Sequence, residues 1–252
     1  MNIAVCIKQV PDVSAPFRVQ DGALVFDTDR TVLNAYDASA VEAALVLQEA
    51  HGGSVEVVTV GPEGITETIR KALAMGADEA VHLVADSDAT FDAHAYSAIL
   101  ARHFAGAEVD AIFCGKQAQD TDAGLTGAML AERLGWAYAT NAVGLDIDGD
   151  ALVVERQSDQ GTEIIELPTP CLVTCSNDMN DPRIPKLKGI MQAKRKPIET
   201  RDVAEFAEDV SPKTAVVGYE PMPEREPGER LEGTPEEMVD TLVAELDEAG
   251  VL

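Results

Sequence analysis

The sequence has few basic residues, no long apolar run and no C-x-x-C pair of cysteines. No apolar run approaches the roughly 18 residues that a membrane-spanning helix needs. The first ten residues, MNIAVCIKQV, become polar too soon for a signal peptide. We therefore expect a cytoplasmic protein that does not insert into a membrane.

Cysteine and histidine usage gives no sign of a metal or a redox motif. The four cysteines are Cys6, Cys114, Cys171 and Cys175, and the first two lie within or at the end of apolar runs. The four histidines are scattered along the chain without the spacing of a ligand set. The sequence therefore predicts reduced core thiols and no metal site.

Basic side chains are scarce, because 19 lysines and arginines stand against 45 aspartates and glutamates, for a formal net charge of −26. Such a charge repels nucleic acids and anionic membranes. An acid excess spread over the whole chain is typical of proteins from extreme halophiles, where concentrated salt screens the repulsion. Each Asp or Glu is thus a surface residue by default rather than a catalytic candidate.

Apolar runs and helical patterns alternate along the first half of the chain, and a 46% hydrophobic content can fill one large core. Strands are expected at Ile3–Ile7, Val55–Val60, Ala80–Val84 and Asp110–Cys114. Helices are expected from a cap at Asn34 or Asp37 to Gly52, from Ile65 to Gly76, over Asp92–Phe104 and over Leu125–Leu134. Asp21-Gly22 predicts a hairpin between Phe17–Val19 and Leu24–Phe26. This order predicts an α/β, Rossmann-like, doubly wound fold with a mostly parallel sheet.

The segment Asp110–Leu134, DAIFCGKQAQDTDAGLTGAMLAERL, joins a predicted strand to a predicted helix through a small polar loop. In a parallel sheet such a loop faces the ligand crevice, and the first N–H groups of the helix point into it. Gly124 and Gly127 allow close approach of the backbone, Thr126 offers a hydroxyl, and Lys116 is a nearby cation. The loop predicts a phosphate site, although an ordinary βα connection has a similar composition and the G-x-x-x-x-G-K-[ST] pattern is absent.

Beyond Gly135 the pattern changes to a period of two, which predicts a β-hairpin portion. Its strands are expected at Ala142–Ile147, Leu152–Gln157, Glu163–Leu167 and Cys171–Cys175. Residues 186–196 then hold five cations and no acid, whereas residues 199–252 hold 16 acids and four bases. We expect residues 1–185 to form a nucleotide-binding domain, and residues 186–252 to form a recognition loop and an extended arm that wraps a partner, with a last helix that begins near Thr234.

Several segments together resemble the β subunit of electron transfer flavoprotein (ETF) nearly end to end. They are VCIKQVPD, LNAYDASAVEAAL, ETIRKALAMGAD, CGKQAQDTDAGLTGAML and the block from VERQSD to KRKPIE. The resemblance implies a heterodimer with an ETF α subunit, which holds most of the FAD. The pair would carry electrons from flavin dehydrogenases, such as acyl-CoA dehydrogenases of fatty acid oxidation, to ETF-quinone oxidoreductase. It also implies an electron carrier rather than an enzyme, and the sequence offers no nucleophile–base pair.

By resemblance, four segments form the nucleotide site. They are Cys6; Asn34, Ala35, Tyr36 and Asp37; Val60; and Ala118, Gln119, Asp120, Thr121, Asp122, Ala123, Gly124, Leu125, Thr126, Gly127, Ala128 and Met129. Ala35 replaces a proline that is frequent in relatives. Val60 replaces a residue that is more polar or contains sulfur in some relatives. Val13 replaces a tyrosine that some relatives place against the flavin, which leaves Tyr36 as the expected aromatic neighbour.

The occupant of this site is expected to be AMP, with a second FAD and electron bifurcation as the alternative. AMP-binding relatives tend to end the loop in T-G-Q-M, and the chain shares Thr126 and Met129 with them. Bifurcating relatives tend to read D-G-D-T-A-Q-V-G-P. Thr121 replaces the glycine of that pattern, and its β-branched side chain would crowd a pyrophosphate.

Leu187, in PKLKGIM, corresponds by resemblance to the apolar anchor of a loop that docks on the dehydrogenase. Lys186 and Lys188 would give it a basic rim, as is common in transient interfaces. The alternative is a buried residue that leads into a helix.

Two other protein classes share an α/β sheet. An ATP-pyrophosphatase or adenylate-forming enzyme would need a loop such as S-G-G-x-D-S, which is absent. A universal-stress type nucleotide sensor would need G-x-x-G, nine residues, then G-[ST], and Gly61 and Gly64 lack this continuation.

Overall fold

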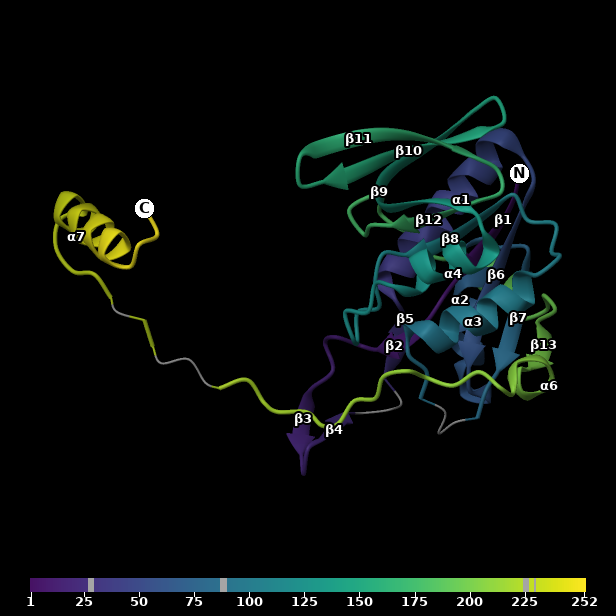
Figure 1. Cartoon of the computed structure of the whole chain (residues 1–252), viewed down its shortest axis with the longest axis horizontal. Coiled ribbons are helices and arrows are strands. Elements are labelled where there is room, and N and C mark those ends of the chain that lie inside the picture. The colour runs from purple at the N-terminus through teal and green to yellow at the C-terminus, as the bar shows by residue number, and fades with distance from the viewer. Residues whose placement is uncertain (27–29, 87–89, 224–226, 229) are drawn as a thin grey trace. The chain divides into compact units, whose positions relative to one another are not determined.

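A nine-stranded sheet forms the centre of the protein, in a computed structural model that describes residues 1–26, 30–86, 90–223, 227–228 and 230–252. The strand order is β11-β10-β9-β12-β8-β1-β6-β7-β13 (Figure 1). Neighbouring strands from β9 to β13 are parallel, whereas β10 is antiparallel to β9 and to β11. The strands are β1 (Asn2–Cys6), β6 (Ser54–Gly61), β7 (Glu79–Val84), β8 (Ala111–Gly115), β9 (Ala137–Asp148), β10 (Ala151–Ser158), β11 (Gly161–Pro168), β12 (Cys171–Cys175) and β13 (Glu199–Asp202).

Helices and two short antiparallel ribbons surround this sheet in the described part of the chain. These helices are α1 (Ala35–His51), α2 (Thr66–Met75), α3 (Ala93–Phe104), α4 (Thr126–Leu134), α5 (Leu187–Ala193) and α6 (Val203–Ala207), with a 3₁₀ turn at Glu63–Ile65. A further helix, α7 (Pro235–Glu248), belongs to a separate part of the chain. The ribbons pair β2 (Gln9–Pro11) with β5 (Thr31–Leu33), and β3 (Phe17–Gln20) with β4 (Ala23–Phe26).

Each face of the sheet has its own buried cluster. Residues of α1 and α2 and the end of α5 pack on one face, around Phe113, and residues of α3, α4 and α6 pack on the other, around Ile112. Ile112 and Phe113 are successive residues of β8, so their side chains point to opposite faces of the sheet. Both are fully buried because helices cover both faces. Burial of each such side chain stabilises the fold by roughly 2–3 kcal/mol. The predicted α/β, doubly wound architecture is confirmed.

The chain reverses its direction of growth across the sheet beside β1. From β1 it adds β6 and then β7 on one side, and it crosses back to add β8 and β12 on the other side. In doubly wound sheets a ligand crevice lies at the carboxyl ends of the strands where the order reverses. The carboxyl ends of β1, β6 and β8 are therefore the place to look for a site.

The predicted elements are found, with a correction in the hairpin portion. The hairpin at Asp21-Gly22 is confirmed as β3–β4, with φ of 52° and 75° at the two turn residues, as a type I′ turn requires. Grouping Cys171–Cys175 with the hairpin strands was wrong, because β12 lies inside the sheet, parallel to both β8 and β9. All five of its residues are buried, as the continuous apolar run of a parallel strand requires.

The chain forms two compact units, Met1–Gly218 and Tyr219–Leu252. Residues 186–207 belong to the first unit, since β13 pairs with β7 and the Arg70 guanidinium donates to the carbonyls of Ala193 (2.6 Å) and Lys196 (2.5 Å). The first compact unit therefore continues past residue 185 to Gly218. The role of residues 186–252 in wrapping a partner stays a prediction.

The second unit contains α7, and its start agrees with the sequence pattern. Thr234 caps the helix, and its side chain and that of Glu237 form a reciprocal capping box. No helix among the described residues is long and apolar enough to cross a membrane.

Candidate functional site

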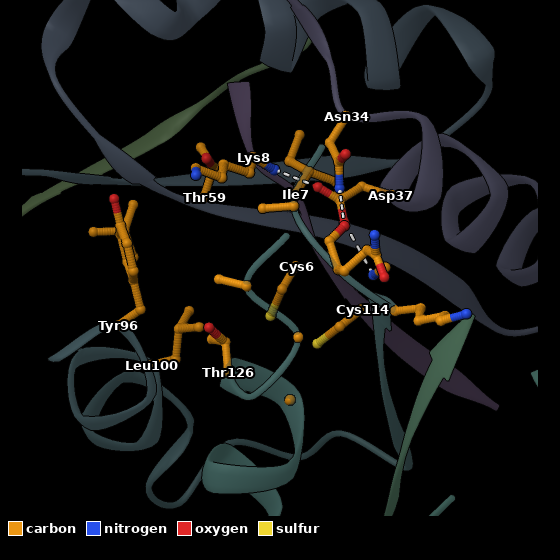
Figure 2. A pocket seen from close by; sticks show the side chains of 18 of the residues that line it. Cys6, Ile7, Lys8, Asn34, Asp37, Thr59, Tyr96, Leu100, Cys114 and Thr126 are labelled. Atoms are coloured by element: carbon orange, nitrogen blue, oxygen red, sulfur yellow. Dashed lines mark hydrogen bonds between the residues drawn. The ribbon is translucent and has the colours of Figure 1, made fainter. Parts of the chain in front are cut away.

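A pocket opens at the carboxyl ends of β1, β6 and β8, where the strand order reverses (Figure 2). Its empty space is about 620 Å³ when the open solvent at its mouth is included. Residues of α3 and of the loop between β8 and α4, called here the β8–α4 loop (residues 116–125), complete its walls. Its place at the reversal of strand order suits a ligand.

Asp37, in the first turn of α1, joins three elements at the pocket. Its carboxylate accepts the backbone N–H of Lys8 (2.7 Å) and that of Gly115 (2.9 Å). A Cβ at residue 115 would overlap the Asp37 carboxylate, so this approach requires glycine. Burial raises the pKa of Asp37 to about 7, although these hydrogen bonds and the Lys8 charge act in the opposite direction. The carboxyl group therefore titrates near neutral pH.

Asn34 holds the β8–α4 loop against the start of α1. Its Nδ2 donates to the carbonyl of Gln117 (2.9 Å), and its Oδ1 accepts the N–H of Gln119 (3.1 Å). The Gln119 side chain in turn accepts the N–H of Ala35 (3.0 Å). Asn34 occupies the N-cap position of α1, as one of the two predicted candidates, but no side-chain capping bond is found among the described residues. The Asn34 and Asp37 side chains bond to other segments instead.

An ion pair closes the same loop from the side of β1. Lys8 Nζ lies 2.8 Å from each carboxylate oxygen of Asp120. Both side chains are partly exposed, so the pair contributes at most about 1 kcal/mol to stability. Inside the loop, Ala118 exchanges backbone hydrogen bonds with Asp122 (2.8 Å) and Ala123 (3.1 Å). The loop is thus a compact turn attached at both sides of the pocket.

The first turn of α4 faces the pocket and is suited to an anion. Leu125 stands at the N-cap position, and no side chain accepts a hydrogen bond there, so the first N–H groups of the helix remain available to a ligand. Gly127 packs so closely on β12 that a Cβ would lie 2.7 Å from Thr174 Cγ2. The free N–H groups and the helix dipole would stabilise a phosphate next to Thr126.

Two thiols lie side by side at the pocket. Cys6 of β1 and Cys114 of β8 are partners in the register of the two parallel strands, and both line the pocket (Figure 2). Hydrogen bonding with Cys114 and burial raise the pKa of Cys6 well above its ordinary value. A protonated thiol is a weak nucleophile. The Cys6 thiol is therefore suited to packing rather than to nucleophilic attack.

Half of the residues predicted for the nucleotide site line this pocket. They are Cys6, Asn34, Asp37, Val60, Ala118, Ala123, Gly124, Thr126 and Gly127. Ala35, Gln119 and Asp120 brace the loop through the contacts described above. Of the described residues, Tyr36, Thr121, Asp122, Leu125, Ala128 and Met129 are adjacent in sequence but outside the lining.

The pocket also contains residues that were missing from the predicted site. They are Ile7, Lys8, Val58, Thr59, Tyr96, Leu100, Cys114, Gly115 and Gln117. Lys116, which was expected as a nearby cation, also lines the pocket. Most are neighbours of predicted positions at strand ends, where the rule for parallel sheets could have found them. Tyr96 and Leu100 have the i, i+4 spacing of a core-facing stripe, and the sequence gives no sign that this stripe also borders a pocket.

The predicted docking residues lie at the exposed start of α5. Leu187 is 74% exposed and Lys186 and Lys188 are exposed on either side, so the alternative of a buried Leu187 was wrong. At Gly189 the helix lies so close to α2 that a Cβ would be 2.5 Å from the carbonyl oxygen of Ala74. The helix is therefore seated on α2 with its apolar residue turned to solvent.

Comparison with known proteins shows the family of this chain. A family model described as electron transfer flavoprotein domain matches residues 23–206. The electron transfer flavoprotein subunit beta of Thermoanaerobacterium thermosaccharolyticum is 37% identical over 262 aligned residues, which cover 100% of both chains. The chain belongs to the ETF β-subunit family. The ETF β subunit of Bradyrhizobium diazoefficiens is 38% identical over 258 residues, and a subunit of the caffeyl-CoA reductase–Etf complex of Acetobacterium woodii is 36% identical over 266 residues, each with 100% of both chains covered.

The site of this ETF β-subunit family member is arranged for binding. One side offers helix N–H groups, Lys8 and the β8–α4 loop to a charged group. The other side offers apolar side chains, including Val60 and Leu100, to a ring or sugar. Such a division between a polar and an apolar half is the usual design of a nucleotide pocket.

Proposed function

We propose that this chain is the β subunit of a heterodimeric ETF that works as an electron carrier in the cytoplasm. It would take electrons from flavin dehydrogenases, such as acyl-CoA dehydrogenases, and deliver them to ETF-quinone oxidoreductase. FAD, held mainly by the α subunit, would supply the electron chemistry. The observation that carries the proposal is the pocket at the reversal point of the sheet, because its loop is attached on both sides in a way that suits retention of a nucleotide.

We propose AMP as the structural occupant of the pocket. The uncapped first turn of α4 fits one phosphate, and Gly124 and Gly127 leave room for the backbone to approach it. The Lys8–Asp120 pair and the Asn34 contacts close the loop, so a longer dinucleotide would have to displace them. These contacts support a small, enclosed ligand.

A second FAD in an electron-bifurcating complex is the second candidate. The observation in its favour is the similarity to a subunit of the caffeyl-CoA reductase–Etf complex of Acetobacterium woodii. The two candidates differ in nucleotide content and in the response to NADH.

The docking role of residues 186–196 forms part of the proposal. Leu187 is an exposed apolar residue between Lys186 and Lys188, and Ile190 and Met191 of the same helix are exposed as well. A small apolar patch with a basic rim is a common composition of transient interfaces. The acidic remainder of the chain supports a further proposal of adaptation to concentrated salt.

Reduction of the heterodimer by a dehydrogenase tests this function. The chain is co-expressed with its α subunit, and the flavin absorbance is followed after mixing with an acyl-CoA dehydrogenase and its substrate in molar KCl. We expect reduction in the wild type and a roughly tenfold lower kcat/KM for Leu187→Ala. Ile164→Ala on β11 is the matched control, because Ile164 is also exposed and lies on a different element.

The other functions predict different results. NADH-dependent reduction of two flavins per heterodimer would favour bifurcation, and ATP hydrolysis by the lone chain would favour an ATP-using enzyme. Loss of flavin or of the melting transition in Leu187→Ala would contradict a docking role for this residue.

A further inference from the structure

Tyr96 forms a wall of the pocket that the predicted nucleotide segments do not include. It lies on α3 one turn before Leu100, and both residues line the pocket. Figure 2 shows Tyr96 across the pocket from Asn34 and Asp37, with Leu100 and Thr126 nearby. A ligand in the pocket would therefore lie between the ring of Tyr96 and the loop side.

The ring of Tyr96 is held in place before any ligand binds. Phe91 contacts it edge to face, with ring centroids 5.5 Å apart and an angle of 76° between the planes. The helix itself is tied to α4, because Arg133 donates to the Ser97 hydroxyl (3.0 Å) and lies 3.1 Å from His94 Nδ1. Tyr96 thus has a fixed position relative to the phosphate-binding end of α4.

The hydroxyl of Tyr96 has no hydrogen-bond partner within the described part of the chain. It is also not among the fully buried polar atoms that lack a partner, so its oxygen keeps some exposed surface. Burial and the neighbouring Asp120 carboxylate raise the pKa of Tyr96, which keeps the hydroxyl protonated and able to donate. A half-buried hydroxyl with a free hydrogen suits a polar atom of a ligand.

We propose that Tyr96 is a nucleotide-binding residue of this pocket, which packs its ring against the nucleoside and donates its hydroxyl to it while the phosphate lies at the start of α4. The inference rests on the proposed nucleotide occupancy of the pocket. It adds an aromatic contact from α3 to a site whose other polar contacts come from strand ends and the β8–α4 loop. Aromatic rings supply large contact areas with little loss of side-chain freedom, which suits slow release of the ligand.

Two variants of Tyr96 separate the ring from the hydroxyl. Tyr96→Phe keeps the ring, and we expect AMP to dissociate from the heterodimer several-fold faster. Tyr96→Leu removes the ring too, and we expect dissociation at least tenfold faster and a lower AMP content after purification. Release is followed by exchange of radiolabelled AMP against excess unlabelled AMP in molar KCl.

Tyr138→Phe is the matched control, since Tyr138 lies on β9, is 39% exposed and is not among the residues that line the pocket. FAD content and the melting temperature should stay at wild-type values in Tyr96→Phe, which a purely structural role would not predict. Dissociation rates equal to the wild-type rate in both Tyr96 variants would overturn the inference. If Tyr96→Leu does not fold, the rate at which AMP dissociates from Tyr96→Phe alone tests the inference.

The nucleotides released from the wild-type complex distinguish a wrong occupant of the pocket from a wrong role for Tyr96. A wild type that releases a second FAD and no AMP refutes the proposed occupant, and the same variants are then measured for release of that FAD. Unchanged FAD release in both would refute the role of Tyr96 as well, whereas faster release would support it for the occupant found.

Discussion

Replacing Arg183 with methionine is expected to loosen the docking segment from α1. Arg183 precedes α5, and its backbone N–H (3.0 Å), Nε (2.8 Å) and Nη2 (3.0 Å) all donate to the carboxylate of Glu42. Its Nη1 (2.5 Å) and Nη2 (3.2 Å) also donate to Glu49, which lies about two helical turns further along α1 on the same face. Two bidentate contacts of this kind fix the position of the chain that leads into Leu187.

The exposure of the three side chains determines how much stability Arg183→Met is expected to lose. The Glu42 side chain is 10% exposed, whereas Arg183 is 31% and Glu49 59% exposed. Removing one partner of a fully buried pair costs about 3–5 kcal/mol, and exposed pairs are worth about 0–1 kcal/mol. The partly exposed Arg183 lies between these cases, so we expect a loss of about 2 kcal/mol and a fall in melting temperature of about 4–8 °C.

Thermal unfolding of the heterodimer by circular dichroism in molar KCl measures this loss. Glu49→Gln is the control, and it should change the melting temperature by no more than about 2–4 °C, because Glu49 is mostly exposed. The double variant Arg183→Met with Glu42→Gln should lose less than the sum of the single variants, since neither charge is then left alone. A melting temperature of Arg183→Met within 1 °C of the wild type would refute this account of the segment.

Three further predictions concern the pocket and the surface. Lys8→Met removes the ion pair with Asp120, so labelled AMP should exchange several-fold faster from the heterodimer, and an unchanged exchange rate would contradict the closing role of this pair. The pKa of Asp37 is raised from 3.8 to about 7 in the folded state, so its contribution to stability is fully present below pH 4 and is lost as the pH rises through 7. The melting temperature of Asp37→Asn should therefore fall less steeply than that of the wild type between pH 4 and 7, and parallel curves would show that Asp37 does not titrate there. Molar KCl should raise the melting temperature relative to ~0.1 M KCl, because it screens repulsion at a net charge of −26, and equal values would exclude adaptation to salt.

Hydrophobic patterns were sufficient to predict the buried parallel strands up to β8, because each is a short apolar run followed by a helix with an apolar stripe. They did not predict the short ribbon of β2 and β5. They failed at β12. Cys171–Cys175 follows two hairpin strands in sequence, and its five buried residues do not reveal which neighbours it has. Its place between β8 and β9 depends on long-range pairing, which a local pattern does not contain.

The sequence pointed to the candidate site at the end of a strand and at the start of a helix, as at Cys6, the last residue of β1, and Thr126, the first residue of α4. Asn34 was assigned a cap because asparagine is frequent at that position, but its amide bonds to the β8–α4 loop instead. The difference arises from a segment about 80 residues away in sequence, as the contact between Asn34 and Gln117 shows. Tyr96 was missed for the same reason, because only the packing of α3 beside the pocket gives its ring an open face.

The nucleotide content of the purified heterodimer tests the central proposal most directly. Nucleotides are released by heat from the wild type and from Gly127→Val, whose side chain would collide with Thr174 at the start of α4, and are quantified by chromatography. We predict one FAD and one AMP per heterodimer in the wild type, and one FAD without AMP in the variant. Two FAD and no AMP in the wild type, or a full AMP content in Gly127→Val, would contradict the proposed occupant and its place in the pocket.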